Sequence, residues 1–197
     1  LPRQIPSSIS QTISDEKLAL LGHLIGDGCT LPRHAIQYTT REFDLAETVS
    51  NLAIQAFGNT LTPRIVRERD WYQVYLSATE PLSRSTRNPI AQWLDNLGVF
   101  GLRSHEKFVP SLIFEQSNAA IALFLRHLWS TDGCIKLVQG KRPRPVAYYA
   151  SSSKRLAQGV QSLLLRFEIN ARLKCLPQVG KGRDQYHVTI TGKSDLE

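Results

Sequence analysis

The chain has 197 residues, of which 42% are hydrophobic, which suits the core of one large or two small domains and excludes a disordered or collagen-like chain. Its longest apolar runs fall far short of the roughly 18–20 residues that span a bilayer, and we expect neither a membrane helix nor a signal peptide. Its three cysteines lack Cys-x-x-Cys spacing, which favours a reducing, cytoplasmic compartment. The net charge of +7 favours a polyanionic partner, most often nucleic acid.

Apolar residues at helical and strand spacing predict alternating elements in the first part of the chain. A first helix begins at Ser14 and ends at Asp27-Gly28, a pair that commonly terminates helices. The elements that follow are a strand at 36–40, a helix at 45–57, two strands at 64–66 and 71–77, and a helix at 90–97. This order is typical of an α+β domain with antiparallel hairpins.

The second part of the chain repeats this order. A helix begins at Ser117 and ends at Asp132-Gly133. After it come a strand at 146–151, a helix at 156–167, and strands at 172–176 and 186–191. The sequence contains no methionine, and we expect it to be a segment of a longer polypeptide.

The repeat is visible in the letters as well as in the pattern. Asp27-Gly28-Cys29 recurs as Asp132-Gly133-Cys134, 105 positions later. Three further matches lie 111, 108 and 114 positions apart: 45–52 with 156–163, 63–65 with 171–173, and 69–74 with 183–188. We therefore expect two αββαββα halves related by a pseudo-twofold axis.

The two Asp-Gly pairs are the main candidates for chemistry. A single Asp-Gly is an ordinary turn, but here each one ends the first helix of a half. Gly22 and Gly26 let the first helix approach a neighbour closely, and the position matching Gly22 is the bulkier His127. If the two helices pack together, Asp27 and Asp132 meet at the axis, where two carboxylates are costly unless cations bind between them. Two carboxylate-held Mg²⁺ ions are a usual apparatus for phosphodiester hydrolysis.

At this point the sequence resembles a known family. The segments 20–28 and 125–133 are similar to the two motifs of LAGLIDADG homing endonucleases, and Lys107-Phe108-Val109-Pro110 resembles the block between those motifs in inteins. The amino-acid sequence as a whole is similar to the endonuclease regions of inteins in cyanobacterial replicative DNA helicases. The resemblance runs from about Ile13 to the last residue. The second motif departs from the consensus at residues 126, 127 and 129–131, but its Asp-Gly is intact.

This resemblance implies a function and a set of roles. It implies a monomeric, site-specific double-strand DNA endonuclease that uses Mg²⁺ or Mn²⁺ and comes from a helicase precursor. The carbonyls of Gly26 and Thr131 would join Asp27 and Asp132 as metal ligands. Lys107 would polarise the attacking water or stabilise the transition state; the alternative is a solvated lysine before a turn. The implied divisions are a lead-in at 1–12, a first half with linking segment at 13–115, and a second half at 116–197.

The strands indicate where DNA would bind. Alternation places Gln73 and Tyr75 on one face of strand 71–77, and His187 and Thr189 on the matching face of strand 185–191. Polar and basic side chains on these two faces predict a DNA-binding saddle; an ordinary solvated sheet face is the alternative. The predicted contacts are Gln37, Arg64, Gln73, Tyr75, Tyr148, Arg172, Lys174, His187 and Thr189, with the loop 140–144 as a further phosphate contact.

Two other functions compete with cleavage. One is a non-cleaving nucleic-acid-binding module on the same fold, such as an RNA maturase or a DNA-binding regulator; retention of both motif aspartates favours the nuclease. The other is protein splicing, but the chain has no N-terminal Cys or Ser and no terminal His-Asn.

The second half is expected to be incomplete at its C-terminal end. At the local offset of 114, the partner of Lys107 falls near position 221, beyond Glu197. The two sites should then be unequal, unless Lys193 or Lys136 substitutes. This predicts target binding with slow cleavage, one strand being cut faster than the other.

Overall fold

The computed structural model describes residues 12–83, 86–139, 144–180 and 182–190. Residues 1–11 of the expected lead-in, residues 140–143 of the basic loop, Thr191 and Lys193 lie outside these ranges. No helix in the described part is long and apolar enough to cross a membrane.

The first half contains the predicted elements in the predicted order. They are α1 (Asp15–Gly26), β1 (Gly28–Cys29), β2 (Gln37–Thr40), α2 (Phe43–Phe57), a 3-10 turn at Gly58–Thr60, β3 (Leu61–Glu68), β4 (Trp71–Ala78) and α3 (Pro89–Asn96). Ser14 is the N-cap of α1, but its side chain makes no capping hydrogen bond. In contrast, Asn88 at the start of α3 does form a side-chain cap, because its Oδ1 accepts a hydrogen bond from the backbone N–H of Ile90.

The short helix α4 (Ser111–Phe114) precedes the second half. This half contains α5 (Asn118–Asp132), β5 (Gly133–Val138), β6 (Arg144–Ser151), α6 (Lys154–Leu164), a 3-10 turn at Leu165–Phe167, β7 (Arg172–Leu176) and β8 (Gln185–Ile190). The strands β1 and β5 were not placed by sequence pattern. A two-residue strand has no alternation to detect, and β5 exposes most of its side chains on both faces.

Each half forms one antiparallel sheet, and the two sheets have matching order and register. The orders are β1-β2-β4-β3 and β5-β6-β8-β7. In the first sheet, Cys29, Gln37, Tyr75 and Arg64 are cross-strand neighbours in one row. The matching row of the second sheet is Cys134, Tyr148, Thr189 and Arg172. These pairs are separated by the offsets of the sequence repeat, so the duplication predicted from sequence is a structural duplication.

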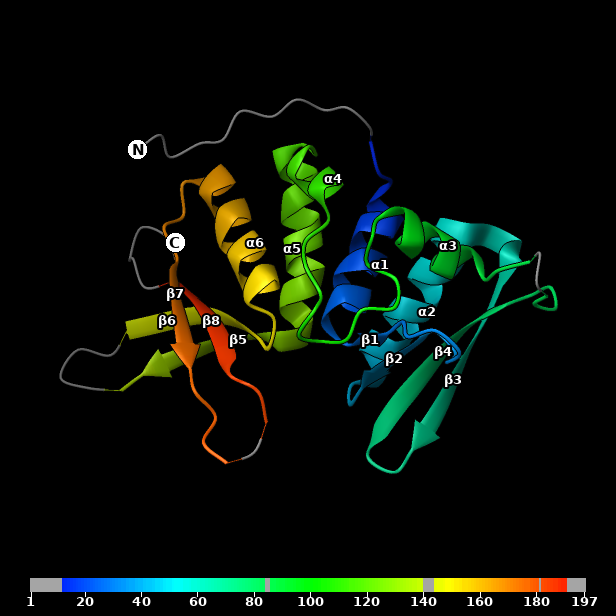
Figure 1. Ribbon diagram of the computed structural model, residues 1–197, viewed down its shortest axis with the longest axis horizontal. Coiled ribbons are helices and arrows are strands. Elements are labelled where there is room, and N and C mark those ends of the chain that lie inside the picture. The colour runs from blue at the N-terminus through cyan, green and yellow to red at the C-terminus, as the bar shows by residue number, and fades with distance from the viewer. Residues whose placement is uncertain (1–11, 84–85, 140–143, 181, 191–197) are drawn as a thin grey trace.

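The helices form a layer above the two sheets (Figure 1). The helices α1 and α5 lie side by side at the centre, with α6 beyond α5 and with α2 and α3 beyond α1. Both central helices end close to the sheets, where the first strand of each half begins. This arrangement is the expected α+β fold with two pseudo-symmetric halves, and it brings the two Asp-Gly pairs to one place.

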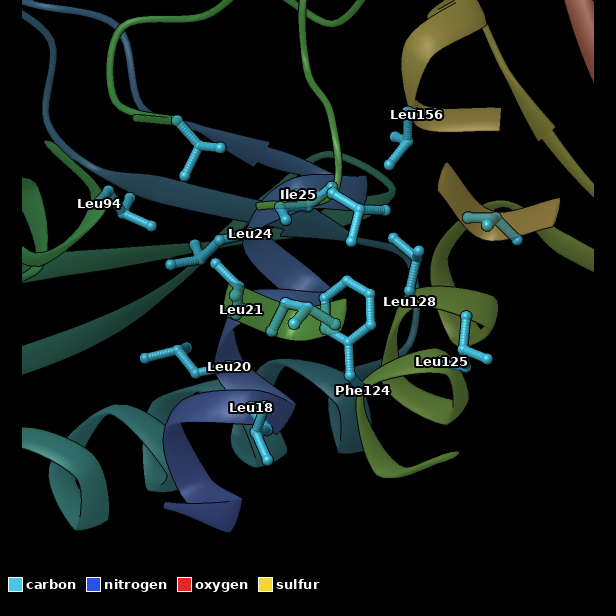
Figure 2. Close-up of a cluster of buried hydrophobic side chains, with 14 of the residues drawn as sticks. Leu18, Leu20, Leu21, Leu24, Ile25, Leu94, Phe124, Leu125, Leu128 and Leu156 are labelled. Atoms are coloured by element: carbon cyan, nitrogen blue, oxygen red, sulfur yellow. The ribbon is translucent and has the colours of Figure 1, made fainter. Parts of the chain in front are cut away.

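The hydrophobic core continues from one half into the other across α1 and α5. Leucines of α1 pack against Phe124, Leu125 and Leu128 of α5, with Leu94 of α3 and Leu156 of α6 at either side (Figure 2). Leu18, Leu21 and Leu128 are fully buried. Because burying one such side chain stabilises a fold by about 1.5–3 kcal/mol, this shared core holds the two halves together.

Candidate metal centre and nucleic-acid face

The two motif helices touch through their small residues. A Cβ added to Gly22 would lie 2.8 Å from the backbone nitrogen of Leu128, and one added to Gly26 would lie within 3 Å of the side chain of Thr131. Side chains larger than hydrogen at these positions would push the helices apart. The glycines four residues apart therefore bring α1 against α5, as predicted.

Asp27 and Asp132 lie together in one recess at the ends of these helices. The recess has a volume of about 220 Å³ and is also lined by Ser104, Ser151, Ser152 and Gln185. Both carboxyl groups can still be reached by solvent, but the protein crowds around them. Burial, then the charge of Asp132, raises the pKa of Asp27 to about 6, and Lys107 opposes the rise. Burial also raises the pKa of Asp132, which Lys107 again opposes.

Lys107 binds the backbone on both sides of Asp27 and is shielded from solvent. Its side chain is 5% exposed, and its Nζ donates to the carbonyls of Leu24 at 3.1 Å, Gly26 at 3.1 Å and Gly28 at 2.7 Å. An ammonium has three protons, and each has an acceptor here. Burial lowers the pKa of Lys107 to about 8, although Asp27, Asp132 and Cys29 favour its charge. It is not the solvated lysine of the alternative reading.

The same lysine links the two halves. Its own carbonyl accepts a 2.6 Å hydrogen bond from the buried hydroxyl of Ser153, which caps α6 in the second half. Among the described residues, no lysine donates to the matching carbonyls of Trp129, Thr131 and Gly133. Lys136 instead lies over the ring of Tyr148, 5.4 Å from its centroid. Within the described residues, the surroundings of Asp27 and Asp132 therefore differ.

The donor set fits a divalent cation that keeps part of its water shell. No group of three or more His, Cys, Asp or Glu side chains suited to a metal exists within the described residues. Two carboxylates whose charge is disfavoured in the protein alone gain from a cation placed between them. Mg²⁺ is commonly held by one or two carboxylates together with waters and substrate phosphate. The fit is therefore to Mg²⁺ or a similar hard ion, not to a structural zinc site.

A histidine pair at the contact of α1 and α5 lies about one helical turn before the carboxylates. Nε2 of His23 on α1 lies 3.0 Å from Nδ1 of His127 on α5. His23 is fully buried, and its ring also packs edge-on against Tyr38. Burial, then His127, lowers the pKa of His23 to about 4, and burial, then Arg126, lowers the pKa of His127. Burial at the helix interface thus favours the neutral form of both rings.

The outer face of the first sheet carries three of its predicted contact residues in one row. Tyr75 pairs with Gln37 on one side and Arg64 on the other, and the Arg64 guanidinium lies 5.2 Å from the centroid of the Tyr75 ring. Gln73 has a different environment. It is only 7% exposed, and its Oε1 accepts a 2.9 Å hydrogen bond from Thr39. Its side chain therefore holds the sheet and offers little surface to a ligand.

The second sheet presents a stacked aromatic pair on the corresponding face. The rings of Tyr148 and His187 are parallel within 5°, with centroids 4.9 Å apart. Thr189 and Arg172 continue the row, and Lys174 pairs with His187 from the edge strand. Arg172 and Lys174 are exposed. The predicted contact residues of this half therefore share one face, with its cations toward the edge of the sheet.

Sequence reasoning missed the polar lining of the recess. Ser104, Ser151 and Ser152 come from loops and a strand end that carry no motif, so nothing in the sequence marks them. Gln185 differs from them, because alternation does place it on the same face of β8 as His187, although it was not expected in the recess. It occupies the position that matches Trp71 in the first half.

Comparison with known proteins now identifies this arrangement. Residues 119–197 match the family described as LAGLIDADG-like domain. A structure of the homing endonuclease I-DmoI superposes with a TM-score of 0.65 at 14% identity, covering 94% of this chain and 87% of that one. The chain has the LAGLIDADG fold. The resemblance predicted from the two Asp-Gly motifs is confirmed.

Other LAGLIDADG structures show the same architecture. I-DmoI in complex with DNA and Mn superposes with a TM-score of 0.60 at 14% identity, covering 94% of each chain. The N-terminal LAGLIDADG domain of DUF199/WhiA superposes with a TM-score of 0.56 at 14% identity, covering 95% of this chain and 80% of that one. At these identities the likeness concerns the fold alone.

Much closer sequence relatives are found within longer proteins. The chain is 69% identical over all 197 residues to a segment of the replicative DNA helicase DnaB of Nostoc sp.. It is 64% identical over 197 residues to a segment of the protein with that name in Synechocystis sp.. It spans only 22% and 23% of these relatives, about a quarter or less of their length.

Proposed function

We propose that this chain is a site-specific, divalent-metal-dependent DNA endonuclease that cuts both strands, the homing endonuclease region of an intein. The observation that carries the proposal is the placing of Asp27 and Asp132, one from each repeat, in a single recess at the pseudo-twofold axis. The recess lies between two sheets whose outer faces carry polar, aromatic and basic side chains. One carboxylate for each half matches a substrate with two strands.

The chemistry follows from the arrangement of the recess. Asp27 and Asp132 would hold Mg²⁺ or Mn²⁺, with the carbonyls of Gly26 and Thr131 as further ligands. Such an ion supplies transition-state charge stabilisation and lowers the pKa of water at a phosphodiester. Lys107 would act by fixing the carbonyls on either side of Asp27 and by placing a positive charge beneath the phosphate that enters the recess.

Recognition of DNA is proposed for the two outer sheet faces. Gln37, Arg64 and Tyr75 of the first sheet, and Tyr148, His187 and Thr189 of the second, would face base edges in the major groove. Arg172 and Lys174 would contact phosphates, which position the protein without reading sequence. The homing endonuclease neighbour solved with DNA and Mn supports this assignment. We leave Gln73 out of the base contacts because it is buried against Thr39.

The sequence relatives indicate which longer protein contains this segment. Because helicases of two organisms contain it at over 60% identity within much longer chains, we propose that it lies in a replicative helicase precursor. The internal pseudo-twofold repeat supplies two half-sites from one chain, so we propose that it acts as a monomer.

A second candidate function is a non-cleaving DNA-binding module on the same fold. The inequality of the two sites favours it, because in the described residues Asp132 lacks a lysine placed as Lys107 is placed beside Asp27. Both functions predict DNA binding, and only cleavage separates them.

Plasmid cleavage tests the proposal. The substrate is a plasmid with the uninterrupted helicase gene, incubated with Mg²⁺ or with EDTA, beside a matched plasmid whose gene already contains the insert. We expect linear product only from the uninterrupted gene and only with Mg²⁺. Binding of this gene without nicking or linearisation, at any Mg²⁺ or Mn²⁺ concentration, would support the second function.

A further inference from the structure

The connection between α3 and α4 contains a tight turn that begins at Arg103. The backbone N–H groups of Glu106 and Lys107 both donate to the carbonyl of Arg103, at 2.8 Å and 3.2 Å. The Glu106 side chain closes the turn from the other direction, because its Oε2 accepts a 2.8 Å hydrogen bond from the backbone N–H of Arg103. Ser104, which lies inside the turn, is therefore held in place by main-chain and side-chain hydrogen bonds together.

Both ends of this turn are anchored beside the end of α1. Before the turn, the N–H of Gly101 donates to the carbonyl of Thr30 at 2.9 Å, just after β1. After it, Lys107 binds the carbonyls of Gly26 and Gly28. In Figure 1 the connection between α3 and α4 passes the lower ends of α1 and α5. The turn therefore has a fixed position relative to the two motif helices.

The turn presents Ser104 to the recess that contains Asp27 and Asp132. Ser104 is exposed, and its hydroxyl makes no hydrogen bond with the described part of the chain. In particular, it donates to neither carboxylate. A serine hydroxyl carries one proton that rotates to meet an acceptor, so this donor is available to a third group that enters the recess.

The size and charge of the recess select a phosphate as that group. At about 220 Å³, the recess is smaller than the pockets of about 300–1,000 Å³ that enclose whole small molecules. It suits one phosphate group with a cation and a few waters. Serine hydroxyls are common donors to the phosphate oxygens of DNA. Beside two carboxylates, an uncharged donor attracts a phosphate without competing with the cation for its place.

We propose that Ser104 binds a non-bridging oxygen of the DNA phosphate that enters the recess, and that Glu106 is the positioning residue for this contact. This inference rests on the proposed endonuclease and names a further substrate-binding residue for it. Because the described residues place a single turn of this kind at the recess, the contact serves the phosphate of one strand. Glu106 acts through the turn, since the N–H of Arg103 loses its side-chain acceptor without it.

Duplex binding tests the contact without any measurement of cleavage. The duplex comes from the uninterrupted helicase gene, and its affinity is measured in Ca²⁺. We expect Ser104→Ala to weaken binding about 5-fold or more, as for the loss of one hydrogen bond to a charged group. Ser50→Ala, on α2 and outside the recess, is the matched control and should bind as the unmodified chain does. Because Ser104 is exposed, its substitution leaves the fold intact.

The role of Glu106 is tested by rescue. Glu106→Gln keeps a side-chain oxygen that can accept from the N–H of Arg103, so it should bind at least as well as the unmodified chain. Glu106→Ala should bind about as weakly as Ser104→Ala, and the double variant should show no further loss. Equal binding by the Ala and Gln variants at 106 would show that Glu106 does not position the contact.

Phosphorothioate duplexes identify the atom that Ser104 binds. Sulfur, a weaker acceptor than oxygen, is placed at each non-bridging position in turn along the protected region of the duplex. We expect one such substitution, on one strand, to weaken binding by the unmodified chain but not by Ser104→Ala. Equal binding of the all-oxygen duplex by Ser104→Ala and the unmodified chain would overturn the inference, as would a sulfur effect that Ser104→Ala retains at every position. A chain that binds but does not cut contradicts the endonuclease, whereas this contact is decided by the binding measurements alone.

Discussion

The two halves of the molecule share a backbone plan but treat their equivalent positions differently. At the axis, glycine in α1 faces threonine or histidine in α5, so one helix supplies space and the other fills it. Beneath the carboxylates, Lys107 secures the end of α1, whereas no described lysine secures the end of α5. On the inner sheet faces, the first half is closed by α3 and the second exposes Ile135.

These differences show what a duplicated fold keeps and what it is free to change. Strand order and register are retained because a one-residue slip would turn every core residue to the wrong face. The groups that bind the carbonyls at the ends of α1 and α5 differ, because strand register places no constraint on them. The two halves therefore differ both within equivalent helices, as at Gly26 and Thr131, and in the segment that supplies Lys107 to one carboxylate alone among the described residues. Substitutions at these matched positions test this comparison.

Outside the two carboxylates themselves, the largest effect is expected at Lys107. Lys107→Ala leaves three carbonyls without their donor and removes the charge beneath Asp27, so we expect strand cleavage to slow about 100-fold or more. Because the contacts flank Asp27, the proposed function predicts a larger effect on the strand assigned to Asp27 than on the strand assigned to Asp132. Single-turnover cleavage with each strand labelled separately measures this. Lys136→Ala is the control, and it should leave both rates within a few-fold of the unmodified chain.

The histidine pair should make folding sensitive to acid. His23 has a pKa of about 4 in the folded chain against 6.5 in a free side chain, so the unfolded state binds the proton more tightly. The free energy of unfolding is therefore highest above about pH 6.5. As the pH drops toward 4, protonation of His23 in the unfolded state lowers this free energy by up to about 3 kcal/mol.

His23→Leu copies the second half, where Leu128 occupies the matching position. Denaturant unfolding at pH 7 and pH 4.5 should show a smaller acid loss in this variant than in the unmodified chain. An identical loss in both would show that the pair does not govern the acid response.

Exchanging the small and the large residue between Gly26 of α1 and Thr131 of α5 should preserve the contact of the two helices. Gly26→Ala places a methyl group against Thr131 and should cost about 2 kcal/mol of unfolding free energy, as overpacking does. Adding Thr131→Gly moves the space to the other helix, and the double variant should recover most of the loss. Additive losses in chemical denaturation would mean that the two positions do not share one contact.

The smallest effects are expected on the two outer sheet faces. His187→Ala should relax preference at a single base position, by about 1 kcal/mol, because it removes one side of the stack with Tyr148. Lys174→Ala should weaken binding to all sequences alike. It should also reduce the slope of the logarithm of affinity against the logarithm of salt concentration by about one. Gln73→Ala should leave sequence preference unchanged and instead loosen the sheet. Competition binding with singly substituted duplexes, at two salt concentrations, separates the three.

The sequence was sufficient to predict the fold and the pair of carboxylates. Both follow from the repeat, because matched Asp-Gly pairs at the ends of matched helices have to meet if the halves are related by symmetry. Pattern alone did not reveal that Gln73 is buried, since alternation identifies a face but not the neighbour that covers it. The contacts of Lys107 join residues about 80 positions apart, and no local signal specifies which carbonyls it binds.

Strand-resolved cleavage by Asp27→Asn and Asp132→Asn is the most direct test of the central claim. The target duplex carries a different fluorophore on each strand and is incubated with Mg²⁺, while binding is measured separately in Ca²⁺. The account predicts that both variants bind the target but lose double-strand cleavage, with each variant losing mainly one strand. Cleavage of both strands by either variant at the rate of the unmodified chain would contradict it.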